Sequence, residues 1–121
     1  MKALVVDDDR DNMEVLALTL ATVAGWEVLA VDTSMEALEI CRSVVLDVVL
    51  LDVEMPLLDG PGVLVALRAD PRTATLPVIF VTACAGPALT ARLRSLGALA
   101  VLAKPFDPLR IGSQLAGILA G

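Results

Sequence analysis

Histidine is absent from the 121 residues of this chain, and cysteine occurs only twice. Without an imidazole, the chain has no zinc site built on histidine, no Ser-His catalysis and no phosphohistidine of its own. Cys41 and Cys84 do not have the spacing of metal ligands, and we interpret them as reduced thiols rather than a disulfide.

Basic residues are also few, with 9 Lys and Arg against 15 Asp and Glu, which gives a net charge of -6. This balance argues against a nucleic-acid binding surface, so we expect no direct contact with nucleic acid.

The chain lacks a clear membrane or secretion segment. No charge falls between Arg72 and Arg92, a stretch about as long as a spanning helix, but Pro77 and Pro87 interrupt it. The apolar run at the N-terminus ends at Asp7, too early for a secretion signal. We therefore expect no membrane contact and a cytoplasmic location.

Strand and helix signals alternate along the chain, with no linker, repeat or low-complexity tract. The predicted strands are residues 3–6, 27–31, 48–51, 78–81 and 99–102. The predicted helices cover about 11–24, a segment capped by Thr33 or Ser34, and about 59–68, 87–96 and 108–120. In the first helix, capped by Asp9 or Asp11, the apolar residues near helical spacing are Val15, Leu16, Leu20 and Val23. The pattern is that of five βα units in one α/β domain.

The strands are continuous runs of Val, Leu and Ile, so both faces of the sheet are expected to be covered by helices. Right-handed crossovers leave few topologies for such a chain, and we predict a five-stranded parallel sheet of order 2-1-3-4-5. That order places a crevice between the first and third strands.

A polar residue follows four of these strands. They are Asp7 and Asp8, Asp52, Thr82 and Lys104. Equivalent ends of parallel strands meet at one edge, so these side chains are expected to share one small site. Three carboxylates held together repel one another, and a hard divalent cation with oxygen ligands relieves that repulsion. Mg²⁺ fits this site best.

Four motifs in order resemble the receiver domain of two-component response regulators. They are VVDDD at the first strand end, LLDVEMPLLDG at the third, VTA at the fourth and KPF after the fifth. The resemblance covers essentially the whole chain. It implies a flavodoxin-like (βα)5 three-layer sandwich, with residues 1–121 forming a single receiver domain. Because the chain starts with Met1, we expect a stand-alone receiver rather than an excised one.

The resemblance also assigns the metal site and the phosphoacceptor. It implies that Asp52 accepts a phosphoryl group and that Asp7 and Asp8 help Asp52 to bind Mg²⁺. The backbone carbonyl of Glu54 would be the remaining protein ligand of the metal.

Other residues would act on the phosphoryl group. The resemblance implies that Thr82 and Lys104 contact the phosphate, and that the side chains of Glu54 and Cys84 tune its lifetime. The chain would be a phosphoacceptor rather than an enzyme. The donor would be a histidine kinase or a histidine phosphotransfer protein, and phosphorylation would switch binding to a downstream partner. A homodimer through the last two helices is left open.

The chain departs from the family pattern at Val101, where many receivers carry Tyr or Phe three residues before the lysine. Valine has few rotamers and no ring to bury or expose, so a signal passed by aromatic rotation is not expected. We hypothesise that output uses the loop after Thr82, or an apolar surface that includes Val101 and parts of the last two helices.

Two alternatives remain. Asp7 and Asp9 form the DxD pattern of haloacid-dehalogenase-like phosphatases, although the usual Thr or Val is replaced by Asp11. The chain is also compatible with a pseudo-receiver, an interaction module that is not phosphorylated.

Overall fold

Five strands alternate with five helices, and the computed structural model describes all of residues 1–121. The strands are β1 (Lys2–Val6), β2 (Glu27–Val31), β3 (Val48–Leu51), β4 (Val78–Thr82) and β5 (Ala100–Ala103). The helices are α1 (Arg10–Thr22), α2 (Ser34–Ser43), α3 (Gly60–Ala69), α4 (Pro87–Ser95) and α5 (Ile111–Ala120). All neighbouring strands pair in parallel in the order β2-β1-β3-β4-β5, which confirms the predicted sheet.

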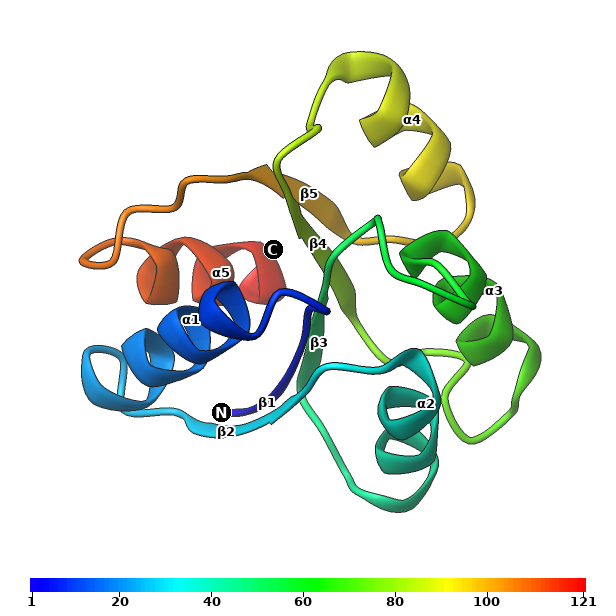
Figure 1. Ribbon diagram of the computed structural model, residues 1–121, viewed down its shortest axis with the longest axis horizontal. Helices are drawn as coiled ribbons and strands as arrows, with labels where there is room; N and C mark the ends of the chain where they lie inside the picture. Colours follow the sequence, from blue (N-terminus) through cyan, green and yellow to red (C-terminus); the bar gives the residue numbers. More distant parts are fainter.

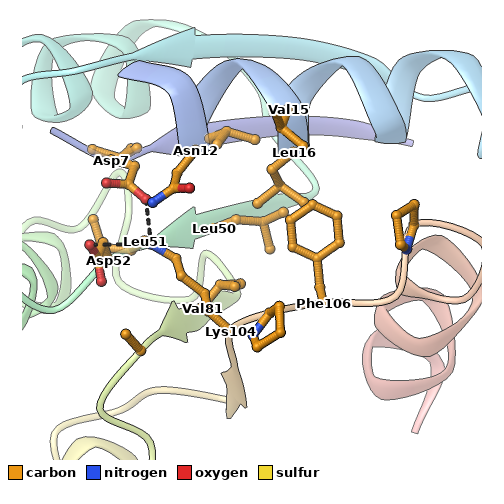
Figure 2. A pocket seen from close by; sticks show the side chains of 15 residues that line it. Asp7, Asn12, Val15, Leu16, Leu50, Leu51, Asp52, Val81, Lys104 and Phe106 are labelled. Carbon is orange, nitrogen blue, oxygen red and sulfur yellow. Dashed lines mark hydrogen bonds and ion pairs between the residues drawn. The ribbon is translucent and has the colours of Figure 1, made fainter. Parts of the chain in front are cut away.

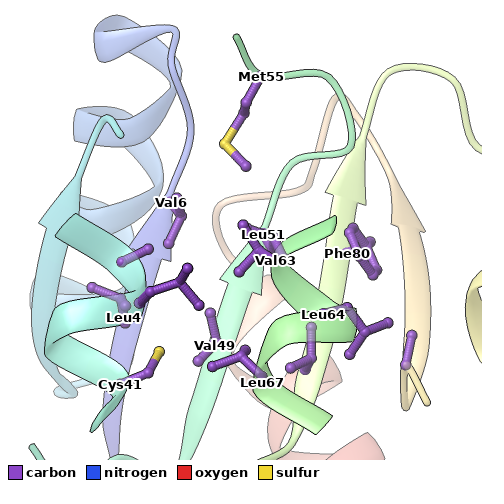
Figure 3. Close-up of a cluster of buried hydrophobic side chains, with 14 of the residues drawn as sticks. Leu4, Val6, Cys41, Val49, Leu51, Met55, Val63, Leu64, Leu67 and Phe80 are labelled. Carbon is purple, nitrogen blue, oxygen red and sulfur yellow. The ribbon is translucent and has the colours of Figure 1, made fainter. Parts of the chain in front are cut away.

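The sheet lies between two layers of helices, with α1 and α5 on one face and α2, α3 and α4 on the other (Figure 1). Successive residues of a strand point to opposite faces, so each strand supplies two apolar clusters. Leu4 and Val6 of β1 enter the cluster on the side of α2 and α3 (Figure 3), whereas Ala3 and Val5 enter the cluster on the side of α1 and α5. Burial on both faces explains the continuous apolar strands and confirms the three-layer sandwich.

Polar side chains begin three of the helices. The Asp9 carboxylate accepts hydrogen bonds from the backbone amides of Asp11 and Asn12 at 3.1 and 3.2 Å, so Asp9 rather than Asp11 caps α1. Thr33 caps α2 in the same way, and Asp59 caps α3. Two of these caps directly follow the loops that carry the acidic residues, and they fix where those loops end.

The first helix is shorter than predicted, and two of its four apolar positions do not face the core. The side chains of Val15 and Val23 are both 54% exposed, whereas the buried residues are Met13, Leu16 and Leu20. Val23 lies beyond the last helical residue. The helix ends there because the chain turns at Gly25, whose φ of 72° glycine adopts without strain.

The C-terminal elements begin later than predicted. β5 begins at Ala100 instead of Leu99, and α5 begins at Ile111 instead of Pro108. Between them, the backbone amides of Arg110 and Ile111 both donate to the carbonyl of Asp107 at 3.0 and 2.9 Å. Pro108 therefore lies in the turn before α5.

Gly60, the first residue of α3, lies directly against the segment that follows β3. Its backbone amide donates to the carbonyl of Val53 at 2.8 Å. A Cβ at this position would lie 2.1 Å from the carbonyl oxygen of Asp52 and 2.7 Å from Cε1 of Phe80. The position of α3 thus sets the backbone of the central acidic residue, and only glycine fits between them.

We expect Gly60→Ala to lower the free energy of unfolding by about 2 kcal/mol or more, because the new methyl group forces the backbone of Asp52 to move. The matched control is Gly117→Ala in α5, where an added Cβ meets nothing within 4 Å. That change should stabilise the protein by about 0.5–1 kcal/mol through helix propensity. Urea unfolding measures both variants, and equal effects of the two would contradict this placement of Gly60.

Candidate functional site

The ends of β1, β3, β4 and β5 meet at one edge of the sheet, as the strand order requires. Backbone hydrogen bonds connect the ends in two pairs, from the amide of Asp52 to the carbonyl of Val6 at 3.1 Å and from the amide of Lys104 to the carbonyl of Thr82 at 2.9 Å, and the pairing of β3 with β4 joins the two pairs. These bonds bring the residues predicted from four separate motifs to the same edge.

Three carboxylates gather at this edge. Asp7, Asp8 and Asp52 each offer a carboxylate oxygen, and these oxygens lie within 4.8 Å of one another. Asp7 is buried, Asp52 is partly buried and Asp8 is exposed, so the group opens to solvent on one side. The carboxylate oxygens come from the ends of β1 and β3, and one side of the group faces solvent. This arrangement suits a hard divalent cation that keeps several waters.

Lys104 approaches the same carboxylates from the end of β5 (Figure 2). Its Nζ lies 2.6 Å from Oδ2 of Asp7 and 3.5 Å from Oδ2 of Asp52. The side chains are 18%, 7% and 15% exposed for Lys104, Asp7 and Asp52, so solvent screens these ion pairs only weakly. One ammonium serves two carboxylates, which leaves a net negative charge.

The pKa values follow from this imbalance. Burial raises the pKa of Asp52, and the neighbouring charge of Asp7 raises it further, against the smaller opposing effects of Lys104 and of the Val53 amide. Burial lowers the pKa of Lys104, but the hydrogen bond to Asp7 and the charges of both carboxylates together outweigh it, so the net pKa is raised. The Lys104 ammonium therefore stays charged. Ionising Asp52 costs free energy, and a further cation beside the carboxylate would reduce that cost.

Thr82 lies at the end of β4 and is buried. Its hydroxyl oxygen accepts a hydrogen bond from the backbone amide of Cys84 at 3.3 Å. This bond fixes the start of the loop after β4. In this state the hydroxyl makes no hydrogen bond to Asp52 or Lys104, so its contact with a phosphate remains a prediction.

Glu54 lines an open cleft together with Asp8, Asp52 and Lys104. This places Glu54 beside the acidic group, while the use of its carbonyl as a metal ligand remains a prediction. Cys84 is an exposed free thiol, and its influence on a phosphoryl group is likewise untested.

Asn12 is a site residue that the sequence reasoning missed. It lines the same cleft, and its amide nitrogen donates to the Asp9 carboxylate at 3.2 Å. The sequence did contain a signal for this contact. Asn12 lies three residues after the helix cap Asp9, a spacing at which the two side chains can reach each other.

Two further residues lie outside the site. Asp47 precedes β3 at the far end of the strand, where its carboxylate accepts a hydrogen bond from the backbone amide of Lys2 at 2.6 Å. Val101 on β5 is half-buried and packs against the cluster shown in Figure 3. The site itself is therefore assembled without Asp47 or Val101.

No helix of the chain combines the length and the apolar character that a membrane span needs.

Comparison with known proteins gives consistent matches. The family model of the response regulator receiver domain matches residues 3–116. The probable chemotaxis protein CheY of Rhizobium etli is 33% identical over 106 residues, which cover 88% of this chain and 82% of that protein. The probable transcriptional regulator ycf27 of Guillardia theta is 33% identical over 118 residues, which cover 98% of this chain and 45% of that protein. The chain thus spans about half the length of the curated relatives that match it first.

Solved structures show the same similarity. A putative response regulator from Chloroflexus aurantiacus has a TM-score of 0.89 and 34% identity, with 99% of this chain and 98% of that chain covered. The receiver domain of the sensor histidine kinase PA1611 from Pseudomonas aeruginosa has a TM-score of 0.87 and 26% identity, with 99% and 98% covered. That structure holds a magnesium ion coordinated in its active-site cleft.

Neutralising Asp52 is expected to stabilise the metal-free protein at pH 7. The folded chain raises the pKa of the Asp52 carboxyl. The contribution of this carboxyl to the free energy of unfolding is therefore fully present below the ordinary carboxyl pKa of about 3.9, and it is lost as the pH rises through the raised pKa of the folded chain. Asp52→Asn should therefore increase the free energy of unfolding at pH 7 in EDTA. The gain should disappear near about pH 3, where both forms are neutral.

Urea unfolding across this pH range measures the effect. Asp47→Asn is the matched control, since it neutralises an exposed carboxylate at the opposite end of the sheet and should give no gain. A loss of stability in Asp52→Asn at pH 7 would contradict the charge imbalance described above.

Proposed function

The chain belongs to the response regulator receiver domain family of two-component signalling, and we propose that Asp52 is the residue that accepts the phosphoryl group. One observation carries this assignment. Asp52 alone combines partial burial, membership of the three-carboxylate group and a lysine ammonium at 3.5 Å. The carboxylate of Asp7 already forms a closer ion pair with the Lys104 ammonium, at 2.6 Å. Asp8 is exposed and forms no ion pair with Lys104.

The acidic group fits a magnesium ion. Asp7, Asp8 and Asp52 would hold it with carboxylate oxygens, and the carbonyl of Glu54 would add a fourth protein ligand. When bound, the metal supplies the positive charge that lets Asp52 stay ionised next to Asp7. The magnesium ion in the similar receiver of PA1611 supports this assignment.

In the transfer step, a carboxylate oxygen of Asp52 attacks phosphorus in line with the leaving group. The new P–O bond forms as the P–N bond of a phosphohistidine breaks, and the electron pair of that bond stays on the imidazole nitrogen. Lys104 then donates to an equatorial phosphoryl oxygen, and the Thr82 hydroxyl donates to another while it still accepts from Cys84. The product is a mixed anhydride, which water later hydrolyses.

The phosphoryl group comes from another protein, because this chain has no histidine. We propose a histidine kinase or a histidine phosphotransfer protein as the donor. In this account the chain is a phosphoacceptor that assists its own modification, not an enzyme with a separate substrate. Glu54 and Cys84 tune the lifetime of the product, and the free thiols of Cys41 and Cys84 suit a cytoplasmic location.

Output does not use an aromatic switch on β5, since Val101 stands at that position. We propose that the loop after Thr82 carries the signal to α4, which buries only Leu93 and is thus weakly anchored. A homodimer through α4 and α5 is a further proposal. It is supported by α5, which has no charged residue between Ile111 and Ala120. The net charge of -6 supports the absence of direct nucleic-acid contact.

Incubation with Mg²⁺ and acetyl phosphate tests the phosphoacceptor. We expect one alkali-labile adduct by intact mass spectrometry, absent in Asp52→Asn and reduced about tenfold or more in Lys104→Gln, which loses a charge contact worth about 1.4 kcal/mol or more. EDTA should abolish the adduct. Asp47→Asn is the control and should be labelled like the wild type.

Other outcomes favour the alternatives. An adduct on Asp7 would support the DxD phosphatase, and no adduct under any condition would support the pseudo-receiver.

A further inference from the structure

A second pocket lies at the opposite end of the sheet from the acidic site, where β3 and β4 begin (Figure 1). We call it the arginine pocket. It is lined by residues 41–46, from the end of α2 toward β3, and by Arg72 and residues 75–77, which precede β4. Its volume is about 360 Å³, a size at which pockets take small organic molecules.

The lining of the arginine pocket carries positive charge only. Two of its 10 residues are arginines, Arg42 and Arg72, and none is Asp or Glu, although the whole chain has 15 acidic residues and a net charge of -6. Burial raises the pKa of the Cys41 thiol to about 11, so this lining residue is neutral at pH 7. The charge of the pocket is therefore separate from that of the acidic group and its metal.

The two arginines converge on a single atom. Nε of Arg42 lies 3.3 Å and Nη2 of Arg72 lies 2.7 Å from Oδ2 of Asp70, which faces a shallow depression beside the pocket rather than the pocket itself. Asp70 thus holds two guanidinium groups side by side but neutralises the charge of only one.

The end of α2 offsets part of the remaining charge. Arg42 lies in the last turn of this helix, whose C-terminal end carries about half a negative charge. Since Asp70 and this helix end together bring less negative charge than the two arginines bring positive charge, the pocket stays positive.

Backbone donors on the same lining also lack partners. The amides of Val45 and Leu46 donate to no backbone carbonyl, although Leu46 is only 9% exposed. Buried amides require an acceptor, so a ligand rich in acceptor oxygens suits this lining.

We propose that the arginine pocket binds a small organic phosphate. The phosphoryl oxygens accept hydrogen bonds from Arg42 and Arg72, and the organic part packs against the apolar lining residues Val44, Leu76 and Pro77. A phosphate has enough oxygens to accept from two guanidinium groups at once, and the charge of the pocket excludes a cation.

This site is independent of the proposed phosphoacceptor. Asp52 and Thr82 lie at the carboxyl ends of β3 and β4, whereas the arginine pocket lies where these two strands begin. A bound organic phosphate would therefore leave the acidic site free, and either proposal can fail without the other.

Three probes test the proposal on the full wild-type chain, in a chloride buffer without divalent metal: phenyl phosphate, benzyl alcohol and inorganic phosphate. The methyl resonances of Val44, Val45 and Leu76 report binding in the pocket. We expect phenyl phosphate to bind there at least about tenfold more tightly than benzyl alcohol, which lacks the charge, and than inorganic phosphate, which lacks the organic part.

Variants that each remove one arginine locate the site. Arg42→Gln and Arg72→Gln should each weaken the binding of phenyl phosphate about tenfold or more. Arg10→Gln is the matched control, because Arg10 is an exposed arginine that pairs with Asp32 at 3.6 Å and does not line the pocket. This variant should leave the Kd within about twofold. Circular dichroism confirms that all three variants fold.

Four results would overturn the proposal. Equal affinity for phenyl phosphate and benzyl alcohol would show that charge does not select the ligand, and equal affinity for phenyl phosphate and inorganic phosphate would show that no organic part is bound. An unchanged Kd in both Arg42→Gln and Arg72→Gln would place the ligand elsewhere. The same loss of affinity in Arg10→Gln would show that only the overall charge of the chain matters.

Discussion

The sharing of one ammonium between two carboxylates is the interaction on which the site depends. Lys104 lies closer to Asp7 than to Asp52, so Asp7 is the better neutralised of the two. Burial leaves Asp52 with a raised pKa and an incomplete set of charge partners. This imbalance favours a further cation beside Asp52, and a carboxylate with a perturbed pKa in a cleft fits the role of phosphoacceptor that we propose for it.

The rest of the fold keeps these charged side chains close together. Two apolar clusters fix the strands from both faces, and backbone hydrogen bonds connect the strand ends that carry the site. Gly60 allows α3 to approach the backbone of Asp52 closely, so the central carboxylate has little freedom to move away from its neighbours. The carboxylates of Asp7, Asp8 and Asp52 repel one another, but the fold keeps their oxygens within 4.8 Å.

Much of the fold and the site could be predicted from residue order alone. Continuous apolar strands indicated burial on both faces, and the rule for parallel strand ends then brought Asp7, Asp52 and Lys104 together. The exposure of Val15 could not be predicted in this way, because apolar spacing on a helix does not say how wide the covered stripe is. The apolar cavity between α1 and the segment after β5 could not be predicted either, because it depends on how far apart these two segments lie over the sheet.

A crystal structure of the chain grown with Mg²⁺ and beryllofluoride would show which carboxylate takes the phosphoryl group. We expect beryllium bonded to a carboxylate oxygen of Asp52, with Nζ of Lys104 moved from Asp7 to a fluoride. A metal ion bound by Asp7 and Asp8 beside an unmodified Asp52 would contradict it.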